Sequence, residues 1–155
     1  MNFLRFAALL LAGAGLAQAE LLGLGVMVGE PSGLTAKSWL DKTHAVDLGL
    51  AYSLSGDTDL QVHADYLIHN FGLLADSGIK GRLPFYYGLG GRLRLREGSG
   101  DDGKDKLGVR VPLGVSWYPP DTQLDIFLEL VPVVDLIPDT EAGLNGALGV
   151  RFWFK

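Results

Sequence analysis

The stretch Asn145–Lys155, N-G-A-L-G-V-R-F-W-F-K, alternates between two kinds of side chain. Side chains of an extended strand point in turn to opposite faces, so this stretch would present two different surfaces. One face is large and apolar, and it consists of Leu148, Val150, Phe152 and Phe154. The other is small or charged apart from one tryptophan, and it consists of Ala147, Gly149, Arg151 and Trp153.

The first 19 residues have the layout of a secretory signal peptide. Arg5 precedes the apolar run Phe6–Leu16, and Ala17-Gln18-Ala19 fits an A-x-A cleavage site. A membrane anchor is the alternative, but the run is shorter than the roughly 20 apolar residues that a spanning helix needs. We therefore expect cleavage after Ala19, which leaves a single domain over residues 20–155.

The composition limits the possible classes of protein. The chain contains no cysteine, so no disulfide stabilises it outside the cytoplasm. Its 13 basic residues, one of which is Arg5, face 18 acidic ones, whereas a nucleic-acid binder needs a basic surface. After the leader, no apolar run is long enough for a membrane helix. Any membrane span would therefore consist of strands.

The rest of the chain divides into alternating segments near the roughly 9–11 residues that a tilted strand needs to cross a bilayer. Turn-forming sequences such as Pro31-Ser32-Gly33 and Ser55-Gly56-Asp57 separate them. Longer connections are expected over Asn70–Arg82 and Glu97–Lys106. The eight predicted strands are Leu22–Gly29, Leu34–Leu40, His44–Ser53, Leu60–Ile68, Phe85–Arg96, Leu107–Tyr118, Leu124–Leu136 and Asn145–Lys155.

Two prolines, Pro112 and Pro132, lie inside the sixth and seventh of these strands. Proline cannot donate a hydrogen bond to a strand ladder, so it is unusual there. We interpret both as bulges, or as positions whose N–H would have had no partner. Either proline could instead mark a strand boundary that the pattern misplaces.

The charges within these segments all fall on one face, opposite the apolar residues. A soluble β-sandwich also buries one apolar face and is an alternative. The charged face is rich in glycine, which suits the crowded interior of an eight-stranded barrel better than a surface in water. A sheet in lipid must close, because an open edge leaves backbone groups unpaired. We therefore predict an all-β fold, a closed eight-stranded antiparallel up-and-down transmembrane β-barrel.

The inward face carries many charged or titratable side chains. Buried charges are tolerated when they are paired, so we interpret them as a salt-bridged network that fills the lumen. A narrow proton or ion path is the alternative, although a lumen of this size is normally too full. Arg110 and Glu129 are expected to pair, because a turn at Pro119–Gln123 would oppose positions summing to about 240. The network consists of Lys37, Asp47, His63, Asp65, Arg92, Arg94, Arg110, Asp125, Glu129 and Arg151.

Aromatic residues gather at one end of the predicted barrel. If the first strand starts at the periplasmic rim, the aromatics collect at that rim, as interfacial belts do. A role in the core would scatter them along the strand centres, where Phe127 lies. The predicted membrane-interface aromatics are Trp39, Tyr66, Phe85, Tyr87, Trp117, Phe152 and Phe154.

In these features the chain resembles the small eight-stranded bacterial outer-membrane barrels, the class that includes OmpX and the OmpA membrane domain. Its Gly149-x-x-Phe152-x-Phe154 looks like the C-terminal signal that the barrel assembly machinery reads. Two positions differ, because Lys155 follows the final aromatic residue and Ala147 stands where a polar residue is common. The resemblance implies an outer-membrane location, contact with outer-membrane lipid and contact with the assembly machinery. We expect a monomer.

Some barrels of this class modify lipid A, and acyl-ester hydrolysis needs a serine, a histidine and a carboxylate within reach. The deacylases carry a His-x-Ser pair on one strand, whereas Ala64 and Asp65 follow His63 here. The pair Asp76-Ser77 falls on the predicted periplasmic side, the wrong leaflet for lipid A. We therefore expect no catalytic residues.

Cofactor and metal motifs are also missing from the sequence. The acidic loop Gly98–Asp105 lacks the ligand spacing of a calcium loop. Gly88–Gly91 is typical of strand glycine rather than of a phosphate-binding loop. We expect a small integral outer-membrane barrel with a structural or surface-interaction role and a charge-filled lumen that is not an open pore. The alternatives are a lipid-modifying barrel enzyme and a soluble periplasmic lipocalin-like barrel with apolar residues inside.

Overall fold

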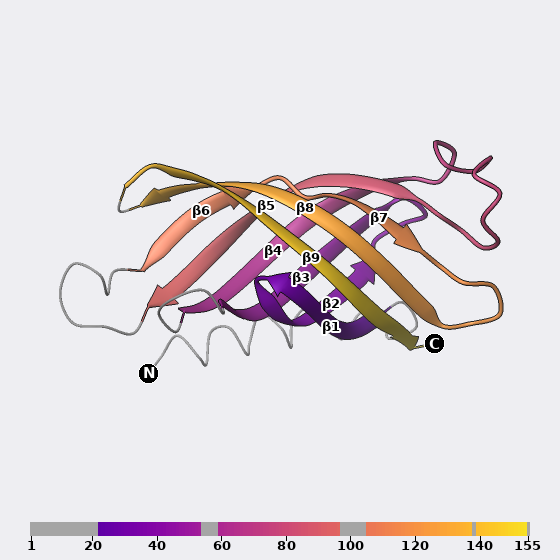
Figure 1. Cartoon of the computed structure of the whole chain (residues 1–155), viewed down its shortest axis with the longest axis horizontal. Helices are drawn as coiled ribbons and strands as arrows, with labels where there is room; N and C mark the ends of the chain where they lie inside the picture. Colours follow the sequence, from indigo (N-terminus) through magenta and orange to yellow (C-terminus); the bar gives the residue numbers. More distant parts are fainter. Residues whose placement is uncertain (1–21, 54–58, 97–104, 138, 155) are drawn as a thin grey trace.

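The computed structural model describes residues 22–53, 59–96, 105–137 and 139–154 (Figure 1). The predicted signal peptide, the turn at Ser55-Gly56-Asp57, residues 97–104 of the Gly/Asp-rich loop, and Lys155 lie outside these ranges. Within the described part of the chain, no helix is long and apolar enough to cross a membrane.

The described residues form nine strands, and several bounds differ from the predicted ones. The closing strand begins at Glu141 rather than Asn145, because β8 and β9 form a long hairpin whose pairing reaches Asp135 and Glu141. The strands are β1 (Leu22–Glu30), β2 (Ser32–Trp39), β3 (His44–Ser53), β4 (Asp59–Asn70), β5 (Phe85–Arg96), β6 (Lys106–Arg110), β7 (Leu113–Trp117), β8 (Leu124–Ile137) and β9 (Glu141–Phe154).

Antiparallel pairing runs around the whole set of strands. Strands β1 to β5 pair in chain order, and β8 pairs with β9. Both β6 and β7 lie between β5 and β8 and share one position. Strand β9 also pairs with β1, from Leu22 opposite Phe154 to Glu30 opposite Gly146. The nine strands therefore occupy a ring of eight positions, in which β6 and β7 follow one another along one position (Figure 1). The prediction of an all-β antiparallel fold is confirmed.

The predicted strand Leu107–Tyr118 is wrong as a single element, because it breaks at Val111 and Pro112 into β6 and β7. Pro112 has no N–H to donate, but its carbonyl accepts a hydrogen bond from Gly88 N at 3.0 Å. Val111 N donates to Pro132 O on β8, also at 3.0 Å. The two halves therefore keep their neighbours although the ladder is interrupted. Pro132 itself lies within β8, opposite Leu144.

The two faces of the ring differ as the alternation predicts. Large apolar side chains such as Leu24, Leu128 and Leu148 are exposed on the outer face. Inside, the glycines make room for large neighbours, because a Cβ built on Gly49 would collide with the ring of His63 directly opposite. The same arrangement recurs around the ring, and the opposed pairs are Gly23–Trp153, Gly49–His63, Gly90–Asp65, Gly108–Asp135, Gly114–Tyr86 and Gly149–Phe127.

The ring has two ends with different connections. We call the end where β1 begins and β9 ends the proximal end, and the opposite one the distal end. The proximal connections span residues 40–43, 71–84 and 118–123. The distal side includes the tight turn between β1 and β2, at Pro31.

Glycine at position 149 is expected to be required for packing. A Cβ there would collide with Cζ and Cε1 of Phe127, so Gly149→Ala should lower the stability of the refolded protein by about 1–3 kcal/mol. Gly143→Ala on the same strand is the matched control, because a Cβ at that position would have no atom of a non-adjacent residue within 4 Å. Thermal unfolding in detergent, followed by circular dichroism, measures both. Equal losses in the two variants would contradict the packing argument.

Candidate functional site

The inside of the ring collects the charged side chains that the strand pattern placed on one face. Nine of the ten predicted network residues are buried, and Arg94, towards the distal end, is half-buried. They come from β2, β3, β4, β5, β6, β8 and β9, so the network joins strands from all sides of the ring. The buried members are Lys37, Asp47, His63, Asp65, Arg92, Arg110, Asp125, Glu129 and Arg151.

Arg151 on β9 is the most extensively bonded of these groups. Its Nη2 lies 2.7 Å from Asp47 Oδ2, and its Nη1 lies 3.1 Å from Asp125 Oδ2. Its Nε donates to Thr35 Oγ1 at 3.1 Å, and the guanidinium lies 4.0 Å from the ring centroid of Phe127. Thr35 in turn donates to Asp47 Oδ1 at 3.2 Å. One guanidinium thus links β2, β3, β8 and β9, with a carboxylate on either side of it.

Arg110 on β6 contacts two acids. Its Nε lies 2.9 Å from Asp65 Oδ1, without the alignment of a hydrogen bond, so this contact is electrostatic. Its Nη2 lies 3.5 Å from Glu129 Oε2, and Glu129 also accepts a hydrogen bond from Tyr86 at 3.0 Å. The predicted Arg110–Glu129 pair is therefore present, as the longer of the two ion pairs.

The register that suggested this pair is nevertheless wrong. Arg110 lies opposite Val133, and Glu129 lies opposite Gly114. The connecting turn places Asp121 in the left-handed region, at φ 58°, and Thr122 Oγ1 donates to Pro119 O at 2.9 Å. This geometry moves the centre of the hairpin past Pro120. Glu129 reaches Arg110 along the inner face rather than directly across the pair of strands.

Arg92 on β5 forms a bidentate pair with Asp135 on β8. Its Nε and Nη2 donate to the two carboxylate oxygens at 3.0 and 2.7 Å, and its Nη1 donates to Gln61 Oε1 at 3.4 Å. Asp135 was not among the predicted network residues, although its position in the alternation is inward. A buried arginine needs an acid within reach. The inward position of Arg92 near the distal end could therefore have indicated that an inward acid near the same end, here Asp135, pairs with it.

Aromatic rings cover the proximal end of the interior. Lys37 Nζ lies 2.7 Å from His69 Nε2 and 4.8 and 5.2 Å from the ring centroids of Trp39 and Tyr86. Trp39 also stacks on Trp153 at 6.1 Å. Trp39 therefore faces into the ring, unlike the other aromatics of the predicted belt. His69 was missed because the predicted strand ended at Ile68, one residue earlier.

The remaining predicted interface aromatics lie near the proximal ends of their strands. Four of them are exposed on the outer face, namely Tyr66, Tyr87, Phe152 and Phe154. Phe85 and Trp117 are half-buried, and the indole N–H of Trp117 donates to Lys80 O at 2.9 Å. In the described residues, no group of three or more His, Asp or Glu side chains has the arrangement of a metal site.

Comparison with known proteins places this fold among small barrels. No protein-family model and no curated protein matches the chain. The N-terminal β-barrel domain of Pseudomonas aeruginosa OprF matches with a TM-score of 0.64 at 15% identity, over 87% of this chain and 98% of that domain. Neisserial surface protein A matches with a TM-score of 0.54 at 14% identity, over 88% and 98%. Both are outer-membrane β-barrels, and in fold the chain resembles the OmpA and OmpX class.

The pair Arg92–Asp135 should behave as a coupled buried pair. Asp135→Leu alone should cost about 3–5 kcal/mol, because Arg92 keeps its buried charge without its carboxylate. Adding Arg92→Met should recover part of that loss. The control pair is Lys106 and Glu141, whose side chains are 17% and 64% exposed. Removing either of these two charges should lower the stability by less than about 1 kcal/mol. Urea unfolding in detergent measures the cycle. Additive losses at Arg92 and Asp135 would show that the two are not coupled.

Proposed function

We propose that this chain is an integral outer-membrane β-barrel, exported by the leader Met1–Ala19 and closed so that its outer face meets lipid. The observation that carries the proposal is the apolar outer face around the whole ring. A soluble monomer rarely exposes an apolar surface so extensive. Every strand contributes an exposed large apolar side chain, for example Val28, Leu34, Leu50, Tyr66, Leu89, Leu107, Leu113, Leu128 and Leu148.

The buried charges support the same orientation. A soluble lipocalin-like barrel would place apolar residues inside and polar residues outside. Here Lys37, Arg110 and Arg151 are buried at 1 to 2% exposure, whereas Leu128 on the outer face is 61% exposed. Water on the outside would leave both groups in the wrong environment, whereas lipid outside suits both.

A structural or surface-interaction role fits the interior better than conduction does. The side chains of Arg110, Arg151, Tyr86 and Phe127 are almost completely buried, so they occupy the space that a pore would need. We propose a filled, charge-paired lumen that is not an open pore, in a protein that functions as a monomer. Insertion would use the assembly machinery through the C-terminal strand.

The contacts of the histidines give little support to a hydrolase. His63 contacts Gln61 at 3.4 Å, and its ring lies against Gly49. His44 does contact both a hydroxyl and a carboxylate, but Thr43 Oγ1 and Asp41 both approach its Nδ1 atom. A relay needs one partner on each ring nitrogen. This arrangement supports a role other than catalysis.

Membrane fractionation tests the location. The full chain, expressed with its leader in a Gram-negative host, should stay in the membrane pellet after a sodium carbonate wash and should appear in the outer-membrane band of a sucrose gradient. A periplasmic soluble protein is the control for release. Recovery of the chain in the carbonate supernatant would overturn the membrane proposal.

Lipid A provides the test for catalysis. Lipid A from cells with and without the protein should give the same mass spectrum, because the contacts of His63 and His44 provide no nucleophile relay. Cells that express a known lipid A deacylase are the positive control. A gained or lost acyl chain that depends on this protein would replace the structural role with an enzymatic one.

A further inference from the structure

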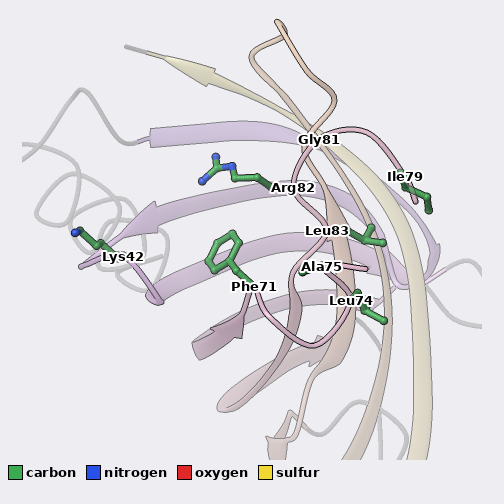
Figure 2. Close-up of a pocket in the computed structure, with 8 residues that line it drawn as sticks. All are labelled: Lys42, Phe71, Leu74, Ala75, Ile79, Gly81, Arg82 and Leu83. Atoms are coloured by element: carbon green, nitrogen blue, oxygen red, sulfur yellow. The ribbon is translucent and has the colours of Figure 1, made fainter. Parts of the chain in front are cut away.

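An open pocket of about 490 Å³ lies at the proximal end, lined by residues of the 71–84 connection and by Lys42 of the β2–β3 turn (Figure 2). Its volume is within the range of small-molecule sites. Neither the interior network nor the strand faces account for it. The lining residues that matter here are Lys42, Phe71, Leu74, Ile79, Arg82 and Leu83.

The pocket has a cationic side and an aliphatic side. Figure 2 shows the Lys42 amine to the left of the Phe71 ring, the Arg82 guanidinium above the ring, and Leu74, Leu83 and Ile79 to its right. Both cations are exposed, and among the described residues neither of them forms an ion pair. Such a site complements a ligand that joins an anionic head to an apolar chain.

Arg82 is held in position for such a ligand. Its backbone N donates to Tyr118 O at 3.2 Å and its carbonyl accepts from Tyr118 N at 2.8 Å, which fixes the connection to the end of the ring. The guanidinium lies 4.9 Å from the ring centroid of Tyr118 and 5.6 Å from that of Phe71. A cation packed on rings loses less freedom when it binds an anion.

Lys42 lies in a turn that is equally well defined. Asp41 accepts hydrogen bonds from Thr43 N at 2.8 Å and from His44 N at 2.7 Å. These bonds and the His44 side chain lower the pKa of Asp41 to about 2, so its carboxylate is ionised at neutral pH and is bonded to its own turn. The turn thus fixes the Lys42 backbone beside the pocket.

The surroundings of the pocket select one source of anionic amphiphile. The exposed aromatics Tyr66 and Tyr87 mark the proximal boundary of the apolar outer face, and Leu73 of the connection is 64% exposed. If the ring spans the outer membrane with this end towards the periplasm, the pocket lies at the headgroup level of the inner leaflet. Phospholipid phosphates lie at that level.

We propose that this pocket binds an anionic glycerophospholipid, with its phosphate between Lys42 and Arg82 and an acyl chain on Leu74, Ile79 and Leu83. The proposal rests on the membrane location proposed above. Each cation near a lipid surface contributes an attraction equivalent to roughly fivefold in affinity. Loss of both should therefore weaken binding roughly 25-fold.

Native mass spectrometry of the refolded full-length barrel, released from neutral detergent, tests the site. Dioleoyl phosphatidylglycerol should bind more tightly than dioleoyl phosphatidylcholine, which has the same chains. The double change Lys42→Gln with Arg82→Gln should weaken phosphatidylglycerol binding and remove its preference over phosphatidylcholine. Lys80→Gln is the matched control, because this lysine belongs to the same connection without lining the pocket. It should leave the preference unchanged. Arg82→Lys should retain most of it.

Three results would overturn the proposal, two from the binding comparison and one from competition. The first is equal binding of the two lipids by the wild-type chain, and the second is a loss in Lys80→Gln as large as in the double variant, which would indicate surface charge alone. Competition by inorganic phosphate as strong as that by phosphatidylglycerol would replace the lipid with a free-phosphate ligand. Far-UV circular dichroism confirms that each variant is folded. A negative lipid-binding result would not change the outcome of the carbonate wash. The lipid site and the membrane location are therefore tested separately.

Discussion

The requirement that governs this structure is the pairing of charges that the strand alternation forces inside the ring. Because the outer face is apolar, an arginine of the inner face can pair only with acidic side chains that also point into the interior. Arg151 shows the consequence, because its partners Asp47 and Asp125 come from β3 and β8, on opposite sides of β9 in the sheet order. Such a group stabilises the ring as a whole, since no two adjacent strands contain the complete set.

Space for these long side chains comes from glycine on the neighbouring strand. Arg110 lies opposite Gly90, Arg92 opposite Gly108 and Arg151 opposite Gly25. The same rule places the ring of Phe127 over Gly149. The high glycine content of the inner face is therefore a packing requirement. A glycine on one strand leaves space that a large side chain of the neighbouring strand fills. A Cβ at Gly90 would meet the Asp65 carboxylate, one at Gly108 would meet the Asp135 carboxylate, and one at Gly25 would meet the backbone of β9.

Local alternation was sufficient to predict most of the strands, since the period of two is a property of each segment by itself. The bounds of β3 and β5 agree with the prediction. Features that depend on the backbone between segments were not predictable in this way. The left-handed Asp121 shifts the register of β7 and β8, and Pro112 divides a strand whose alternation continues across it. His69 was missed as an interior residue for a similar reason, because the alternation does not indicate where a strand ends.

Pairing across the interior lies further beyond the sequence. The inward positions of Arg92 and Asp135 follow from parity, but their contact depends on how β5 and β8 are placed around the ring on either side of β6. No short-range pattern encodes that separation. The pocket depends in the same way on a connection without alternation, since Arg82 is positioned by its backbone pairing with Tyr118.

The aromatic layer at the proximal end separates the pocket from the interior network. Phe71 of the pocket lies 6.1 Å from Trp39 and 6.3 Å from His69, measured between ring centroids. Behind these rings, His69 contacts Lys37 at 2.7 Å. A ligand between Lys42 and Arg82 would therefore be separated from the interior network by these rings. The proposed lipid site is therefore compatible with the proposed filled lumen, because ions on a path through the centre would have to pass the stacked rings and then the paired charges.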